Sequence, residues 1–160
     1  MPTTPRKLDL TQPALLAEII VRGGDLTDMR NDQRKILKAN YRKPGQIYTV
    51  HGLSVFVSND PAHPKTYQML AADNLVPNKR LSISIIGAVK NALARAGYGT
   101  ILYVTPDVNL PDHHDLVVYT IDAAGMPTSG DMDEPEDAAA DAIISAIIRV
   151  EDNPTPAQNP

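Results

Sequence analysis

The chain has 160 residues, 42% of them hydrophobic and 21% charged, which is the composition of an ordinary globular protein with one core. It has no cysteine, which excludes disulfides, thiolate zinc sites, iron–sulfur clusters and thiol nucleophiles. The net charge of −4 is unevenly distributed. Residues 1–95 carry fourteen Lys and Arg against seven Asp and Glu, a formal +7, whereas residues 96–160 carry one Arg against twelve acids, a formal −11. Only the first part is suited to approach phosphate groups.

Both ends of the chain have the composition of tails. Residues 1–10 and 151–160 are polar and rich in proline, so they lack the apolar surface that offsets the entropy of ordering. We therefore expect one domain over residues 11–150 between two mobile segments. The chain has no hydrophobic run typical of a signal peptide or a membrane span. These features predict a soluble, cytoplasmic protein.

Two helices are expected in the first forty residues. The first begins after Thr11, and its apolar residues fall at helical spacing before Gly23: Leu15, Leu16, Ile19 and Ile20. The second runs from Thr27 to about Asn40. One arc of this second helix is apolar and the neighbouring arc is basic, as expected for an amphipathic helix with a charged outer face.

The middle of the chain predicts a hairpin and two further helices. Residues 47–58 form two short apolar runs around His51–Gly52, a pattern typical of a tight β-hairpin. Residues 66–74 favour a helix. Residues 81–85 alternate as a strand does, but the helical period of the apolar residues from 85 to 96 favours one helix over residues 81–96.

The last third predicts two strands and a helix. Residues 100–105 and 116–121 are rich in β-branched and aromatic residues, and the intervening segment has turn chemistry. A final helix starts near Pro135 and carries an apolar stripe that ends at Ile148. Together these elements predict an α+β fold, a single compact domain in which a small, largely antiparallel sheet of two hairpin-like strand pairs packs with four to five helices.

One loop concentrates residues that serve as ligands or general bases. It runs from Asp107 to Asp115 and contains the candidate catalytic residues Asp112, His113, His114 and Asp115. Neighbouring side chains of an extended segment point to opposite sides, so His113 and His114 are poorly placed to bind one metal ion. We predict no metal site and no cofactor, and a catalytic site here needs partners from elsewhere in the chain.

A second candidate surface is basic. Cations follow one another at helical spacing and continue just after the second helix, and they are the candidate nucleic-acid contacts: Arg30, Arg34, Lys38, Arg42 and Lys43. A helix with one charged arc is more often a solvated face. Acidic residues before and within the final helix are explained by the favourable interaction of carboxylates with exposed N–H groups at a helix start. The alternative is an acidic segment that mimics nucleic acid or lies over the basic face.

A short strand after Gly52 carries Ser54 and Ser58 on either side of Phe56, and this arrangement resembles the serine-containing strand of ADP-ribosyltransferases. That family also requires a glutamate near a late strand. All glutamates of the chain lie outside the predicted strands, so the sequence does not place it in that family: Glu18, Glu134, Glu136 and Glu151.

No phosphate-binding loop, dinucleotide fingerprint or zinc deaminase pattern is present in the sequence. We therefore expect a non-catalytic accessory protein that acts through protein contacts, including self-association. Its small size and mobile tails are typical of proteins encoded by a phage or mobile element. Two alternatives stay open. One is a nucleic-acid-associated factor that uses the basic helix, and the other is a small hydrolase or toxin-type transferase with its site in the His/Asp loop.

Overall fold

A computed structural model describes residues 6–41, 51–60, 62–74, 76, 79–105, 108–128 and 134–153. Within these ranges the chain forms twelve elements. The strands are β1 (Arg6–Lys7), β2 (Ile19–Gly23), β3 (Leu53–Phe56), β4 (Arg80–Ile85), β5 (Tyr98–Val104), β6 (His113–Thr120) and β7 (Arg149–Asp152). The helices are α1 (Pro13–Leu16), α2 (Gln33–Tyr41), α3 (Tyr67–Asp73), α4 (Ile86–Arg95) and α5 (Asp137–Ser145).

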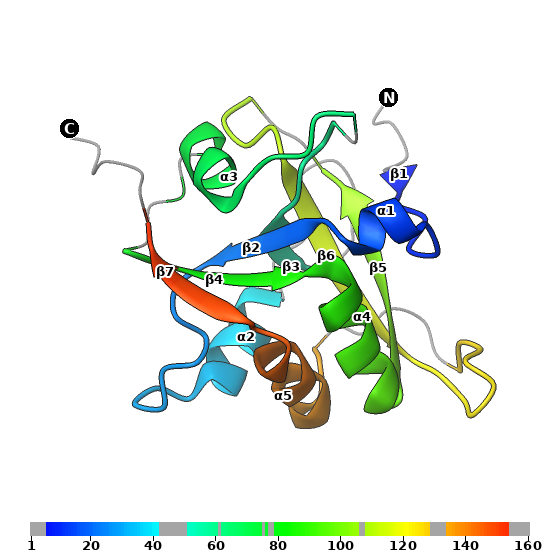
Figure 1. Ribbon diagram of the computed structural model, residues 1–160. Helices are drawn as coiled ribbons and strands as arrows, with labels where there is room; N and C mark the ends of the chain where they lie inside the picture. Colours follow the sequence, from blue (N-terminus) through cyan, green and yellow to red (C-terminus); the bar gives the residue numbers. More distant parts are fainter. Residues whose placement is uncertain are drawn as a thin grey trace.

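All seven described strands join one antiparallel sheet in the order β1-β5-β6-β3-β2-β4-β7 (Figure 1). The expectation of a small sheet made of two hairpin-like pairs is therefore wrong. Among the described strands, only β5 and β6 pair with each other without another helix or strand between them in the chain. Every other described pairing joins strands that are separated by at least one further element. Such pairings leave no turn signature in the sequence, which is why the sheet was underestimated.

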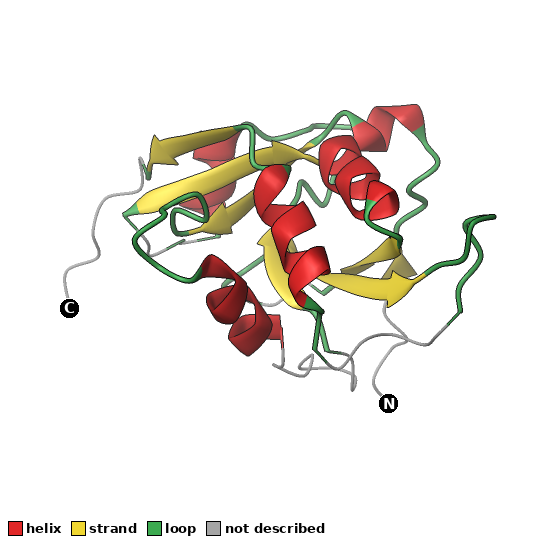
Figure 2. Cartoon of the chain, turned by 90° about the horizontal axis from the view of Figure 1, so that it is seen from below, coloured by secondary structure: helices red, strands yellow, loops and turns green. Residues whose placement is uncertain are grey.

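Helices cover both faces of this sheet. Helix α3 lies on one face, and α2, α4 and α5 lie on the other, where they stand in front of the strands in Figure 2. Strand β3 shows how the two cores divide: Leu53 and Val55 join the core beneath α4 and α5, whereas Phe56 joins the core beneath α3. Because side chains alternate along a strand, Ser54 shares the α3 face with Phe56.

The predicted helix over residues 81–96 is a strand followed by a helix. Residues 80–85 pair with β2 on one side and β7 on the other, and the helix begins only at Ile86. The alternation of residues 81–85 marks the strand, and the helical period of the apolar residues applies only to the segment that follows it. Tertiary pairing decided between the two periods.

The first two predicted helices are shorter than expected. Helix α1 ends at Leu16, and the isoleucines expected on its face belong to β2, in the middle of the sheet. The second helix begins at Gln33 and not at Thr27, because the Asp28 side chain accepts the backbone N–H of Arg30 and holds a turn there.

The expected hairpins had different outcomes. The pairing of β5 with β6 confirms the second one, with Leu102 opposite Leu116. The first expected hairpin covered residues 47–58. Its residues 47–50 lie outside the described part, and its second strand, β3, pairs with β2 and β6. The final helix packs on the sheet as expected, with Ala140 and Ile143 buried, but it ends at Ser145.

Strands also lie outside the expected domain limits of 11–150. Strand β1 pairs with β5, and β7 continues to Asp152 beside β4. No helix in the described ranges is long and apolar enough to span a bilayer.

Candidate functional site

A serine and a histidine meet on the α3 face of the sheet. Ser54 lies on β3, opposite Asp115 of β6, and His113 lies two residues earlier on β6, opposite Phe56. This diagonal relation places the Ser54 and His113 side chains on the same face, within reach of each other. Ser54 Oγ is 2.6 Å from His113 Nε2, and both residues are half-buried.

Thr105 determines which nitrogen of His113 carries the proton. His113 Nδ1 lies 3.1 Å from the Thr105 carbonyl oxygen and 2.7 Å from its hydroxyl oxygen. A carbonyl only accepts, so Nδ1 is the N–H donor of the neutral ring. The Thr105 hydroxyl in turn donates to the His113 carbonyl at 3.3 Å. Nε2 is thereby left as the acceptor for the Ser54 hydroxyl, which is the tautomer of a general base.

The surrounding residues hold these two side chains in place. The Phe56 and His113 rings make an edge-on contact at 5.9 Å between centroids. Arg22 Nη1 donates to the Ser54 carbonyl at 2.7 Å, and burial lowers the pKa of Arg22 to about 10. At Gly52 any Cβ would lie 2.8 Å from Asp115 Cβ, so only glycine allows β3 to approach β6 this closely beside the pair.

Asp112, a second predicted site residue, is committed to a buried network. Its carboxylate accepts from Lys65 Nζ at 2.6 Å, Asn74 Nδ2 at 2.9 Å and the Asn59 N–H at 3.0 Å. Burial alone would raise the pKa of Asp112, but these hydrogen bonds and the Lys65 charge outweigh it and leave the pKa below its usual value. Three donors hold the Asp112 carboxylate, and none of them is Ser54 or His113.

His114 lies on the opposite face of β6 from His113. It is fully buried, and its Nδ1 lies 2.8 Å from the Asp112 carbonyl oxygen. Burial lowers the pKa of His114 to about 4, so the ring is neutral at physiological pH. As predicted, the side chains of His113 and His114 point to opposite sides. Both residues lie in β6 and not in a loop.

Asp115 is also in β6 and is buried on the Ser54 face, whereas Asp107 lies outside the described part.

The described residues contain no cluster of three or more His, Asp or Glu side chains arranged to hold a metal ion. The groups that the structure brings together on the α3 face are a hydroxyl, an imidazole and the residues that orient them. Comparison of the chain with protein families, curated proteins and solved structures gives no match. What the site can do has to be derived from its own geometry.

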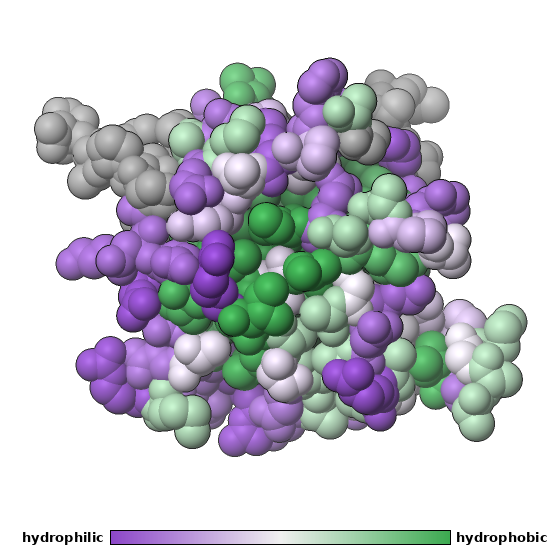
Figure 3. All heavy atoms as spheres, in the orientation of Figure 1, coloured by the Kyte–Doolittle hydropathy of each residue, from purple (hydrophilic) through white to green (hydrophobic). Residues whose placement is uncertain are grey.

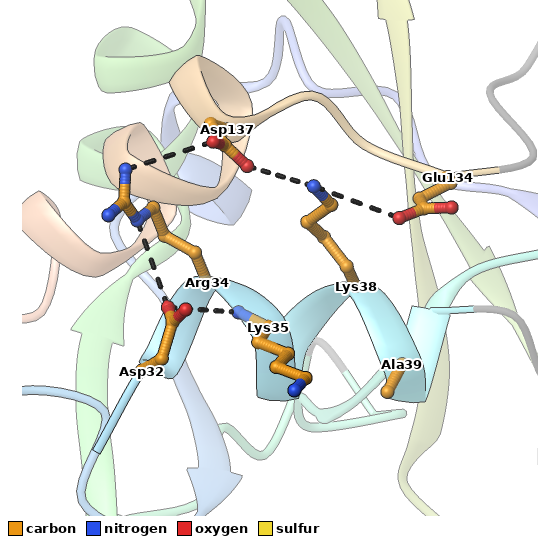
Figure 4. A pocket seen from close by; sticks show the side chains of 7 residues that line it. All are labelled: Asp32, Arg34, Lys35, Lys38, Ala39, Glu134 and Asp137. Atoms are coloured by element: carbon orange, nitrogen blue, oxygen red, sulfur yellow. Dashed lines mark hydrogen bonds and ion pairs between the residues drawn. The ribbon is translucent and has the colours of Figure 1, made fainter.

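The basic helix meets the acidic helix. Lys38 Nζ lies between Asp137 at 2.8 Å and Glu134 at 3.7 Å, and Arg34 approaches Asp137 at 3.8 Å (Figure 4). Lys35 points away from these acids. These residues surround an open pocket of about 400 Å³ in which the charges of α2 are largely balanced by those of α5. The two oppositely charged parts of the sequence thus touch here.

The other predicted nucleic-acid contacts do not extend this surface. Arg30 lies before α2 and forms an ion pair with Asp28 at 2.7 Å, while Arg42 and Lys43 lie outside the described residues. Among the described candidates, Arg30, Arg34 and Lys38 each have an acidic neighbour. This arrangement gives less positive potential than the sequence spacing suggested.

From the sequence, Ser54 was named only through the resemblance to ADP-ribosyltransferases, which was not accepted, and Thr105 was not named at all. They lie 59 and 8 residues from His113 in the sequence, and only strand pairing brings the serine to the imidazole. One signal was present in the sequence: a serine flanked by Leu53 and Val55 occupies the polar position of an otherwise apolar strand.

Proposed function

We propose that this chain is a small serine-dependent hydrolase or acyltransferase, in which Ser54 is the nucleophile and His113 the general base. The proposal rests on two consecutive hydrogen bonds, one between Ser54 Oγ and His113 Nε2 and the other from His113 Nδ1 to the Thr105 carbonyl oxygen. A nucleophile in contact with a base that is itself oriented by a third group is the recurring arrangement of covalent catalysis.

The proposed reaction is acyl transfer from an ester. His113 Nε2 takes the hydroxyl proton of Ser54 as Oγ bonds to the ester carbonyl carbon, and the imidazolium returns this proton to the leaving alcohol as the ester C–O bond breaks. Water then attacks the acyl-serine with His113 again as base, which releases the acid and restores Ser54. An alcohol or amine in place of water gives acyl transfer. Thr105 keeps Nδ1 as the donor throughout.

The test is covalent labelling of the full-length chain with a fluorophosphonate probe, read by intact mass and peptide mapping. We expect one adduct, on Ser54. Ser54→Ala abolishes it, and His113→Gln slows it by about 100-fold, the usual contribution of a general base. Ser145→Ala and His63→Ala are matched controls, because these residues are exposed in the structure and lie outside the site.

Hydrolysis of p-nitrophenyl acetate by the same set of variants supplies a second reading. The proposal predicts that the labelling rate and the hydrolysis rate fall together in the Ser54 and His113 variants and persist in the two controls. A wild-type chain that is not labelled, or one that is labelled equally after His113→Gln, rejects the proposal.

The other expectations from the sequence stay predictions. An accessory role through protein contacts and a nucleic-acid role both predict binding without labelling of Ser54. The ion pairs at Arg34 and Lys38 weigh against the second, since a phosphate backbone would have to displace Asp137. A cytoplasmic location and a phage or mobile-element source likewise rest on the sequence alone.

A further inference from the structure

Strand β7 ends the described sheet. It pairs with β4 on one side, and no described strand lies on its other side (Figure 1, red). Asn153 N–H donates to the Lys79 carbonyl at 3.0 Å, and Arg80 is opposite Asp152 in the register. Bonded pairs alternate along an antiparallel ladder, so Arg149 and Glu151 also direct their backbone groups to β4. The N–H and C=O of Val150 and Asp152 therefore point to the open edge.

The side chains of β7 are complementary to themselves. When two copies of this strand run antiparallel about Val150, each Arg149 is opposite the Glu151 of the other copy, and Val150 is opposite Val150. The outward groups of Val150 then make the bonded pair at the centre, which agrees with the alternation derived from Asn153. Arg149 and Glu151 occupy the non-bonded pairs, where opposing side chains come closest.

We propose that β7 is a self-association edge that pairs with β7 of a second copy of this chain across a twofold axis, which joins the two sheets into one. The Val150 pair supplies two hydrogen bonds. Ile148 lies just before β7 and its N–H already donates to the Ile83 carbonyl at 3.0 Å, so the pairing of the two copies is centred on residues 149–151. Two Arg149–Glu151 ion pairs flank the centre and select the antiparallel register.

Apolar surface next to this edge supports the same partner. Ile148, immediately before β7, is 59% exposed, and Val150 is half-buried. Hydrophobic residues gather in the middle of the face that carries β4, β7 and α5 (Figure 3). In the proposed pairing each Ile148 lies opposite Asp152 and adjoins the Val150 pair, so part of this surface leaves water. Within one chain Arg149 lies 3.0 Å from Glu151 and 5.1 Å from the centroid of the Tyr67 ring, so both charged side chains lie on the same side of the strand.

Sedimentation equilibrium of the full-length chain across a range of concentrations tests the proposal. We expect a reversible dimer of twice the 17.3 kDa chain mass. Val150→Pro removes one outward donor per copy and none of the bonds to β4, because proline is tolerated on a strand edge that faces solvent. This variant should shift the equilibrium to monomer while the melting temperature at low concentration stays close to that of the wild type.

Exchanging the charges of Arg149 and Glu151 by mutation tests whether the two copies pair in the proposed register. Arg149→Glu places like charges opposite each other in both symmetric pairs, and it should weaken the dimer by about tenfold, which corresponds to roughly 1.4 kcal/mol. The double variant Arg149→Glu with Glu151→Arg restores both pairs and should restore the dimer. A wild type that stays monomeric at every concentration, a dimer that Val150→Pro leaves intact, or a double variant no tighter than the single one overturns the proposal.

Discussion

Lys65 Nζ lies 2.6 Å from Asp112 Oδ2, and this contact ties the segment before α3 to the segment before β6. The Asp112 side chain is only 2% exposed, whereas Lys65 is 20% exposed and also reaches Asp73 at 2.9 Å. The lysine thus neutralises a carboxylate that has little access to water. Loss of the lysine would leave that carboxylate buried with neutral donors alone.

Lys65→Met should therefore lower the free energy of unfolding at pH 7 by about 3 kcal/mol, as expected when one partner of a buried pair is removed. The pKa of Asp112 is lowered in the folded chain, so its stabilising effect is present above the usual carboxyl pKa and is lost as the pH falls. Without Lys65 this pKa rises, and acid unfolding moves to higher pH. Urea unfolding at several pH values measures both effects. Lys35→Met, on the exposed side of α2, should change stability by less than about 0.5 kcal/mol, and equal losses in the two variants would contradict the assignment.

His114 should make the protein less stable in mild acid. The folded chain does not protonate His114 until the pH falls to about 4, whereas the unfolded chain does so near 6.5. Protonation therefore favours the unfolded chain between these values, and stability present above pH 6.5 is lost as the pH falls toward 4. At pH 5 the loss should be about 1 to 2 kcal/mol. His114→Leu should flatten this part of the profile, as measured by denaturant unfolding at pH 7 and pH 5. Ser145→Ala, an exposed substitution that changes no ionisable group, should leave the profile as it is.

The ion pairs between α2 and α5 should contribute modestly and depend on salt. Lys38→Glu replaces the attraction to Asp137 by repulsion and should cost about 1 kcal/mol at low ionic strength, the upper end for surface pairs. Combining Lys38→Glu with Asp137→Lys should recover most of this loss. The difference should shrink in 0.5 M salt, because screening weakens exposed charges. Melting curves of the single and double variants measure it, and a loss that the exchange does not recover would mean that packing of the lysine stem dominates.

The sequence predicted the elements whose signals are local. The β5–β6 hairpin has β-branched strands and a turn-rich connection, and the final helix has its own apolar stripe. The central strand β2 was predicted as helix because Ile19 and Ile20 extend the spacing of Leu15 and Leu16. A strand buried on both faces has no alternation to reveal it. Its identity depends on neighbours that come later in the chain, and no local period records them.

Only part of the candidate site could be predicted from the sequence, because the rest depends on pairing between strands that are distant in the chain. His113 was singled out by residue type, and three of the candidates around it divide in the structure into a network carboxylate, a buried neutral imidazole and a buried aspartate. The partner serine needed the β3–β6 register, in which a shift by one residue would turn Ser54 to the other face. Residue types alone identified the imidazole but not its partner or its orientation.

The position of β4 has a consequence for synthesis on the ribosome. One neighbour of β4 is β2, which precedes it, and the other is β7, near the end of the described chain. A nascent chain that has emerged only through α4 can pair β2 with β4, but the second edge of β4, with its buried Leu81 and Ile83, still has no strand to bond. This edge, like the edge of β3 that β6 later covers, is open to pairing with another chain, and a chaperone that shields it until β7 emerges would raise the yield of folded protein.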